Sequence, residues 1–90
     1  STIASADYAY IYGDSELAPA ITSGATLLIQ QTAELSKTGF YVIDKENPYI
    51  SRCVPRGSKV LVGHDNDVIS ADREGIEILG RVLTAINPLA

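Results

Sequence analysis

Short apolar and aromatic runs alternate with polar turns along most of the chain, and this pattern predicts strands rather than helices. The segment from 40 to 63 shows it best, because it predicts three strands joined by two tight connections, one of them at Pro48. Gly80, inside the last apolar run, predicts a bulge or bend. Segments 14–24 and 64–75 predict loops, the first containing a short piece that can be read as helical. The expected strands are 8–12, 25–31, 40–44, 49–54, 59–63 and 76–86.

The number and shortness of these strands predict a small, mostly β fold with little helix. The 90 residues are enough for one domain with a modest core, so residues 1–90 are expected to form a single unit. The chain begins with Ser rather than Met. We therefore expect that it is part of a longer protein.

Charge, apolar run length and cysteine content limit which partners and which compartment are expected. The net charge is −4, and the seven Lys and Arg residues are scattered, so this chain is not expected to bind nucleic acid through phosphate contacts. No apolar run is long enough to cross a membrane. The single cysteine, Cys53, fits a reducing cytoplasm and is expected to pack as a small apolar residue. No cofactor is expected.

Four blocks of the sequence resemble the C-terminal domain of LexA-like proteins and phage repressors. GDSELAPAITSGATLLI (13–29) is similar to the family segment Gly-Asp-Ser-Met-x-Pro-x-Ile-x-x-Gly-Asp-x-Val/Leu. GFYVI with YISRCV resembles the hairpin that follows in the family, and KVLVGHDND resembles a strand that runs into a Ser-Asp-Asn-Pro loop. ILGRVLTAI is similar to the closing Ile-x-Gly-Arg-Val-Val strand. The resemblance spans residues 9–86.

The resemblance implies a strongly bent, signal-peptidase-like β fold. In this family the domain forms the C-terminal half of repressors whose N-terminal half is a helix-turn-helix DNA reader, which this chain lacks. Phage repressors use the domain to form dimers and higher oligomers. Cleavable members also use it as a self-cleaving serine peptidase with a Ser–Lys dyad.

Ser15 occupies the position of the family nucleophile. A serine hydroxyl needs a general base within hydrogen-bond reach, and the family supplies a lysine on the following hairpin. Here the corresponding position holds Ser51, or Arg52 if the alignment slips by one residue. Serine is too weakly basic, and arginine stays protonated. The general base is therefore expected to be absent, which leaves Ser15 and Ser51 as vestigial positions in a domain that is not an enzyme.

Other candidate bases are poorly placed in the sequence. Lys45 and Lys59 lie in the turns on either side of the 49–54 strand, and His64 lies in the loop after residues 59–63. Glu16 replaces the family methionine, and a carboxylate beside the nucleophile opposes formation of an alkoxide. Ser15 is thus interpreted as a structural turn residue. An active autopeptidase using Ser15 with an unrecognised base is the rival interpretation, and an unrelated small β domain is a third.

The leading functional hypothesis is an oligomerisation domain of a phage or prophage transcriptional repressor that maintains lysogeny in a bacterial cytoplasm. Joining two DNA-reading heads raises operator affinity without a new DNA contact. The expected partners are further copies of the chain and an antirepressor protein, with DNA bound only through the missing head. A signal-peptidase-like enzyme acting on other chains ranks last, because no membrane anchor is present. The expected self-association surface is an edge strand at 76–86, with Ile78, Arg81, Leu83 and Ala85 as its candidate residues.

Several further residues allow two interpretations each. Tyr8, Tyr10 and Tyr12 at period two can form an exposed adhesive face or one side of a strand packed on the core. Asp14 is read as a cap for backbone donors rather than as an acid or base. The acidic run at 65–67 (Asp65, Asn66, Asp67) is read as a solvated turn rather than a metal site. Arg81 is read either as an ion-pair partner across a subunit contact or as a surface residue.

Overall fold

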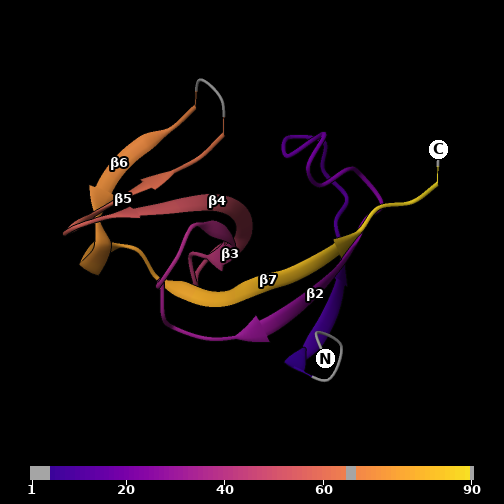
Figure 1. The fold of residues 1–90 in the computed structure, drawn as a ribbon, viewed down its shortest axis with the longest axis horizontal. Helices are drawn as coiled ribbons and strands as arrows, with labels where there is room; N and C mark the ends of the chain where they lie inside the picture. Colours follow the sequence, from indigo (N-terminus) through magenta and orange to yellow (C-terminus); the bar gives the residue numbers. More distant parts are fainter. Residues whose placement is uncertain (1–4, 65–66, 90) are drawn as a thin grey trace.

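The computed structural model describes residues 5–64 and 67–89, and its regular structure is almost entirely one antiparallel sheet (Figure 1). The strand order is β1-β2-β7-β3-β4-β5-β6, so β1 and β6 are the edges. A single 3₁₀ turn, η1, lies between β6 and β7. The expected mostly β fold with little helix is therefore confirmed. The elements are β1 (Tyr8–Ile11), β2 (Thr26–Gln31), β3 (Gly39–Ile43), β4 (Tyr49–Arg56), β5 (Lys59–Val62), β6 (Ile69–Asp72), η1 (Arg73–Gly75) and β7 (Ile78–Ile86).

The expected strands are all present, with bounds within two residues of those expected, but one loop assignment was wrong. β4 runs through Pro55, which pairs with Val60, although a proline lacks the backbone donor that usually marks a strand interior. The segment 64–75, expected to be a loop, contains β6, which pairs with β5. No side chain of β6 is buried, so its sequence has no apolar pattern that predicts a strand. Segment 14–24 forms turns and contains no helix.

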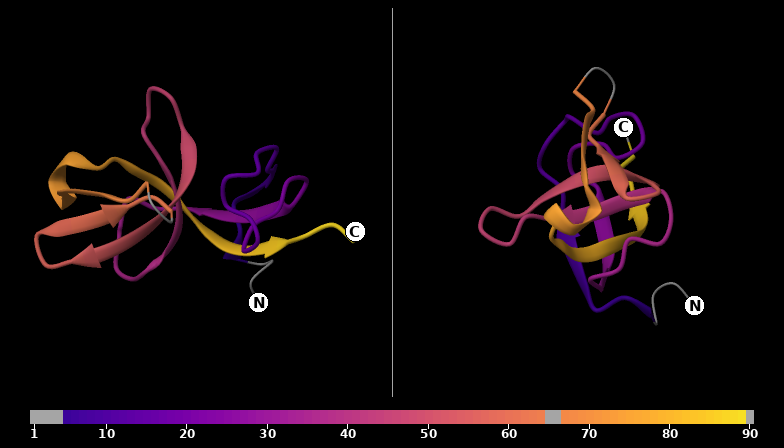
Figure 2. Two further views of the ribbon diagram at one scale, coloured as in Figure 1. Left: turned by 90° about the horizontal axis from the view of Figure 1, so that it is seen from above. Right: turned by 90° about the vertical axis from the view of Figure 1, so that its left-hand side faces the viewer.

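Strand β7 joins two parts of the sheet. Gly80 and Arg81 pair with β2 on one side and β3 on the other. Ile78 pairs only with β3, and four later residues pair only with β2, namely Val82, Thr84, Ala85 and Ile86. Both ladders shift register along β7. A bulge bends the strand that carries it and increases its twist, so the bend expected near Gly80 is confirmed. Figure 2 shows β1, β2 and the end of β7 as one lobe and β3–β6 as the other.

Each lobe has its own apolar core. Strand β3 contributes to both, because Val42 points into the first core while Tyr41 and Ile43 point into the second. The hydroxyl of Tyr41 donates to the Lys37 carbonyl at 2.7 Å, which satisfies the polar end of this fully buried ring. The buried residues are Tyr12, Leu17, Ile21, Ala25, Leu27, Ile29 and Val42 in the first core, and Leu35, Tyr41, Ile43, Cys53, Val60 and Val62 in the second.

The helical content is too small for a membrane crossing. Within residues 5–64 and 67–89, no helix has the length and apolar character that a spanning segment requires.

Candidate functional site

The loop that carries Ser15 is anchored at both ends and by two apolar side chains. Where the loop begins, the backbone N–H of Tyr12 donates to the Ala25 carbonyl at 2.8 Å. The Tyr12 carbonyl accepts from the Gly24 N–H at 2.6 Å, which closes the loop. Leu17 and Ile21 are buried in the first core. The loop thus has an apolar inner side, and the residues between these anchors face outward.

Ser15 lies on the outer side of this loop. Its side chain is exposed, and its backbone N–H donates to the Asp14 carboxylate at 2.7 Å. Its carbonyl accepts from the Ala18 N–H at 3.3 Å. The expectation that Asp14 serves backbone donors is therefore confirmed, although no helix follows it. The contacts of Ser15 are those of a turn residue.

Ser51, by contrast, is buried in strand β4. Its side chain is only 5% exposed, and its hydroxyl donates to the Arg52 carbonyl at 3.2 Å. Arg52 is exposed because neighbouring residues of a strand point to opposite faces. Of the two residues that the alignment allowed at the lysine position, the structure therefore turns Ser51 inward and Arg52 toward solvent.

Ser51 lines a cavity of about 420 Å³, here called the serine cleft, together with Glu16 and His64. The residues that line this cleft include no lysine or arginine. Lys59 instead pairs with Asp72 on the neighbouring strand β6, with Nζ and Oδ1 2.6 Å apart. The lining residues are Glu16, Leu17, Tyr49, Ile50, Ser51, Val62, Gly63, His64, Asp67 and Ile69.

The chemistry of the serine cleft follows from this lining. Its described lining residues supply the hydroxyls of Ser51 and Tyr49, an imidazole and two carboxylates, and Ser15 itself is not among them. His64, which the sequence placed poorly for a base, is half-buried and shares the cleft with Ser51 and Glu16. No local pattern signals this position, because His64 shares the cleft with Glu16, which comes from the distant loop that carries Ser15.

Comparison with known proteins adds no relative. Neither a scan against models of protein families nor a search of curated proteins found a match for this chain.

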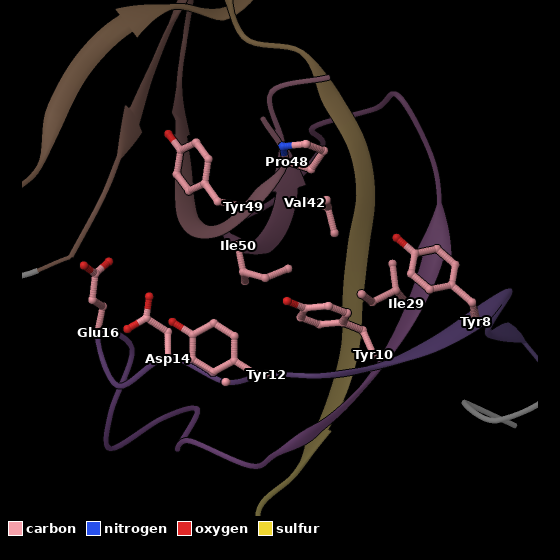
Figure 3. A pocket seen from close by; sticks show the side chains of 11 residues that line it. Tyr8, Tyr10, Tyr12, Asp14, Glu16, Ile29, Val42, Pro48, Tyr49 and Ile50 are labelled. Carbon is pink, nitrogen blue, oxygen red and sulfur yellow. The ribbon is translucent and has the colours of Figure 1, made fainter. Parts of the chain in front are cut away.

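A second cavity, of about 520 Å³, lies between β1 and the β3–β4 hairpin (Figure 3). We call it the tyrosine cleft, because four of the five tyrosines line it. Ile29, Val42 and Ile50 supply its aliphatic surface, and Asp14 and Glu16 stand at one end. The lining residues are Tyr8, Tyr10, Tyr12, Gly13, Asp14, Glu16, Ile29, Val42, Pro48, Tyr49 and Ile50.

Both interpretations of the tyrosine row hold, each for part of it. Tyr12 is buried in the first core at 6% exposure, whereas Tyr10 remains 49% exposed. Burial raises the pKa of Tyr12, and the nearby Asp14 and Glu16 carboxylates raise it further. Tyr49 was not singled out in the sequence. It reaches this cleft only because the β3–β4 hairpin folds over β2.

The candidate interface on β7 has a different position from the one expected. Ile78 packs against the second core and Ala85 against the first, while Arg81 and Leu83 are half-buried. The premise that this segment is an edge strand was wrong, because β7 lies between β2 and β3 in the sheet.

The remaining chemical candidates have no catalytic features. Cys53 is fully buried, and burial raises the pKa of its thiol to about 11. Its Sγ donates to the Ser51 carbonyl at 3.8 Å. Asp65 and Asn66 lie outside the described residues. In the part of the chain that the structure describes, no three His, Cys, Asp or Glu side chains are grouped as metal ligands would be.

Proposed function

We propose that this chain is the oligomerisation domain of a phage-type or prophage transcriptional repressor, and that it is not an enzyme. Its role is to join DNA-reading heads so that they bind operator half-sites together. The proposal rests on the resemblance of four sequence blocks to this family, on the mostly β fold, and on the chemistry of the serine cleft. DNA contact belongs to an N-terminal helix-turn-helix domain outside this chain, in a bacterial cytoplasm.

One observation carries the non-cleaving part of the proposal. The cleft that receives Ser51 is lined by Glu16 and Asp67 and by no lysine. A Ser–Lys dyad needs an uncharged amine next to the serine hydroxyl, and a cleft with two carboxylates favours the charged form of any amine that enters it. Ser15 is in addition exposed and held only through its backbone and Asp14.

The sheet edges support self-association. Ile11 on β1 and Ile69 on β6 are each 61% exposed, and neither strand contains Lys, Arg or Pro. Those residue types are the usual protection of an edge strand against pairing with another chain. We therefore place the contact between copies at an open edge of the sheet, with the half-buried β7 residues Arg81 and Leu83 as the alternative surface.

Sedimentation equilibrium across concentration tests this proposal. We expect reversible dimers or larger species at micromolar concentration. A lysine in one of the two edges, as in Ile11→Lys or Ile69→Lys, is expected to weaken association at least tenfold. Leu83→Ala is the comparison on β7, and a larger effect there would move the contact to that strand. A chain that stays monomeric at high micromolar concentration would refute the proposal.

Induction of a repressor that does not cleave itself needs a separate protein. We propose an antirepressor that binds this domain. Co-sedimentation of the chain with candidate proteins from the same genome, followed by operator release in the full-length repressor, is the test. Retention of operator binding by every such complex would exclude this route.

One observation favours the rival function, a self-cleaving peptidase using Ser15. His64 lies in the same cleft as Glu16, next to the loop that carries Ser15. A longer chain that includes the upstream residues should then cleave itself at an upstream peptide bond at alkaline pH. Ser15→Ala and His64→Ala should each abolish this cleavage. An intact longer chain under these conditions would end this interpretation.

A further inference from the structure

We infer that the tyrosine cleft binds an extended peptide segment of another protein that carries one arginine. The inference does not rest on the proposed function, since a monomer, or a dimer joined through the edge of β6, leaves the edge of β1 open. It rests on the aromatic walls of the cleft, the charge at one end and the open edge of β1.

The walls of the tyrosine cleft are aromatic and open to solvent. Tyr8 and Tyr10 on β1 are 39% and 49% exposed, and Tyr49 on the opposite hairpin is 50% exposed. Ile29 and Val42 are buried on the side of the cleft facing the core. Exposed aromatic rings around an apolar floor are typical of a recognition surface, because they supply contact area at low cost in side-chain entropy.

The charge of the cleft selects a cation. Asp14 and Glu16 are its only charged lining residues, and Figure 3 shows both carboxylates at the same end, beyond Tyr12. Burial is the main cause of the raised pKa of Tyr12, and the two carboxylates raise it further, which fits their position at this end. A guanidinium can pair with the carboxylates and stack on a tyrosine face, so arginine fits better than lysine.

The length of the tyrosine cleft and its position beside the open edge of β1 favour an extended peptide over a small molecule as the ligand. The row from Tyr8 to Tyr12 spans about 14 Å, which corresponds to about four residues of extended peptide. Among the described strands, β1 pairs only with β2, so its other side is open for backbone pairing. A bound segment can thus add to the edge of β1 while its side chains enter the cleft.

The test uses the intact chain and a blocked peptide of about six residues with one arginine between two leucines. The chain has no tryptophan, and the fifth tyrosine, Tyr41, is fully buried, so a change in tyrosine emission reports the cleft. Titration followed by emission and by calorimetry should give saturable binding that weakens with added salt. The same peptide with citrulline in place of arginine should bind about three- to tenfold more weakly.

Variants of the chain locate the site. Tyr10→Ala and the double change Asp14→Asn with Glu16→Gln should each weaken binding about three- to tenfold, and Tyr10→Phe should restore it. Glu74→Gln, on η1 and away from the cleft, is the charge-matched control that should bind like the original chain. Unchanged thermal unfolding of each variant shows that the fold persists.

Three results would overturn the inference. The first is no saturable binding at millimolar peptide. The second is equal binding of the arginine and citrulline peptides, which would make the cleft a purely apolar surface. The third is equally tight binding of free arginine amide, which would make it a site for a small organic cation.

Discussion

At the scale of single residues, Gly80 shows how closely β7 approaches β2. A Cβ at this position would lie 2.9 Å from Ile29 Cγ2 and 3.1 Å from the Gln30 carbonyl oxygen. The residue is buried, and both of its neighbouring strands are paired to it. The glycine is therefore required by packing rather than by an unusual backbone angle.

We expect Gly80→Ala to lower the free energy of unfolding by about 1–3 kcal/mol, because the added methyl group must displace Ile29 or the β2 backbone. Urea denaturation measures the change. Gly75→Ala is the matched control, since no atom lies within 4 Å of its added Cβ. Equal stability of the two variants would contradict the packing argument.

Cys53 leads to a prediction about alkaline pH. Burial raises its pKa from 9.0 to about 11 in the folded protein, so the folded state keeps a proton that the unfolded state loses. The contribution of this thiol to stability is complete below about pH 9 and is lost as pH rises toward 11.

The measurement for Cys53 is urea denaturation at pH 8 and pH 10.5, with Cys53→Ala as the comparison. The original chain should lose more stability between these values than Cys53→Ala, because the variant has no thiol to titrate; the raised pKa of Tyr12 affects both chains alike. Native chain should also resist thiol-reactive dye at pH 8 and react after denaturation. Rapid labelling of the native chain would show that Cys53 is accessible.

At the scale of elements, Arg73 connects η1 to two other segments, the β4–β5 turn and the β2–β3 connection. Its guanidinium donates to the Gly57 carbonyl in the β4–β5 turn at 3.1 Å and to the Leu35 carbonyl in the β2–β3 connection. Its backbone N–H donates to the Ser58 carbonyl at 3.0 Å. Because η1 has no buried residue, these bonds hold it against the sheet.

Arg73→Gln is expected to cost about 1–2 kcal/mol of unfolding free energy, since a glutamine cannot reach both carbonyls with charged donors. Hydrogen exchange should become faster around Leu35 and in the β4–β5 turn. Lys59→Gln, which removes an exposed ion pair, should cost less than about 1 kcal/mol. A larger loss from Lys59→Gln than from Arg73→Gln would reverse this ranking.

At the scale of the whole molecule, the C-terminal segment holds the loop that carries Ser15. The side-chain oxygen of Asn87 accepts from the N–H and hydroxyl of Thr22, each at 3.1 Å. Its amide nitrogen donates to the Ala20 carbonyl at 3.4 Å. One residue after β7 thus fixes a loop more than 60 positions earlier in the sequence.

We expect Asn87→Ala to cost about 1–2 kcal/mol and to accelerate hydrogen exchange between residues 15 and 24. Asn87→Asp should cost less, because it keeps the oxygen that accepts from Thr22. Exchange rates in β5 and β6 serve as an internal reference, since they lie in the other lobe. Unchanged exchange in the 15–24 loop would show that Asn87 does not hold it.

The amino-acid sequence by itself determined the mostly β class, six of the seven strands and the bend near Gly80. These features depend on local patterns, because apolar alternation and turn-forming residues each determine the backbone over only a few positions. It also determined that neither Ser51 nor Arg52 is the lysine that the resemblance to LexA-like proteins would require as the general base. It did not reveal β6, whose residues are all accessible and whose pairing with β5 carries no local signal.

Only the tertiary structure decided which of these residues meet. Ser51 turns inward beside His64 while Ser15 turns outward, and no spacing in the chain indicates either orientation. The tyrosine cleft arises because the hairpin bearing Tyr49 folds over β2 to face β1. Such contacts join residues tens of positions apart, and their geometry depends on the twist and register of every strand between them, which a local pattern does not contain.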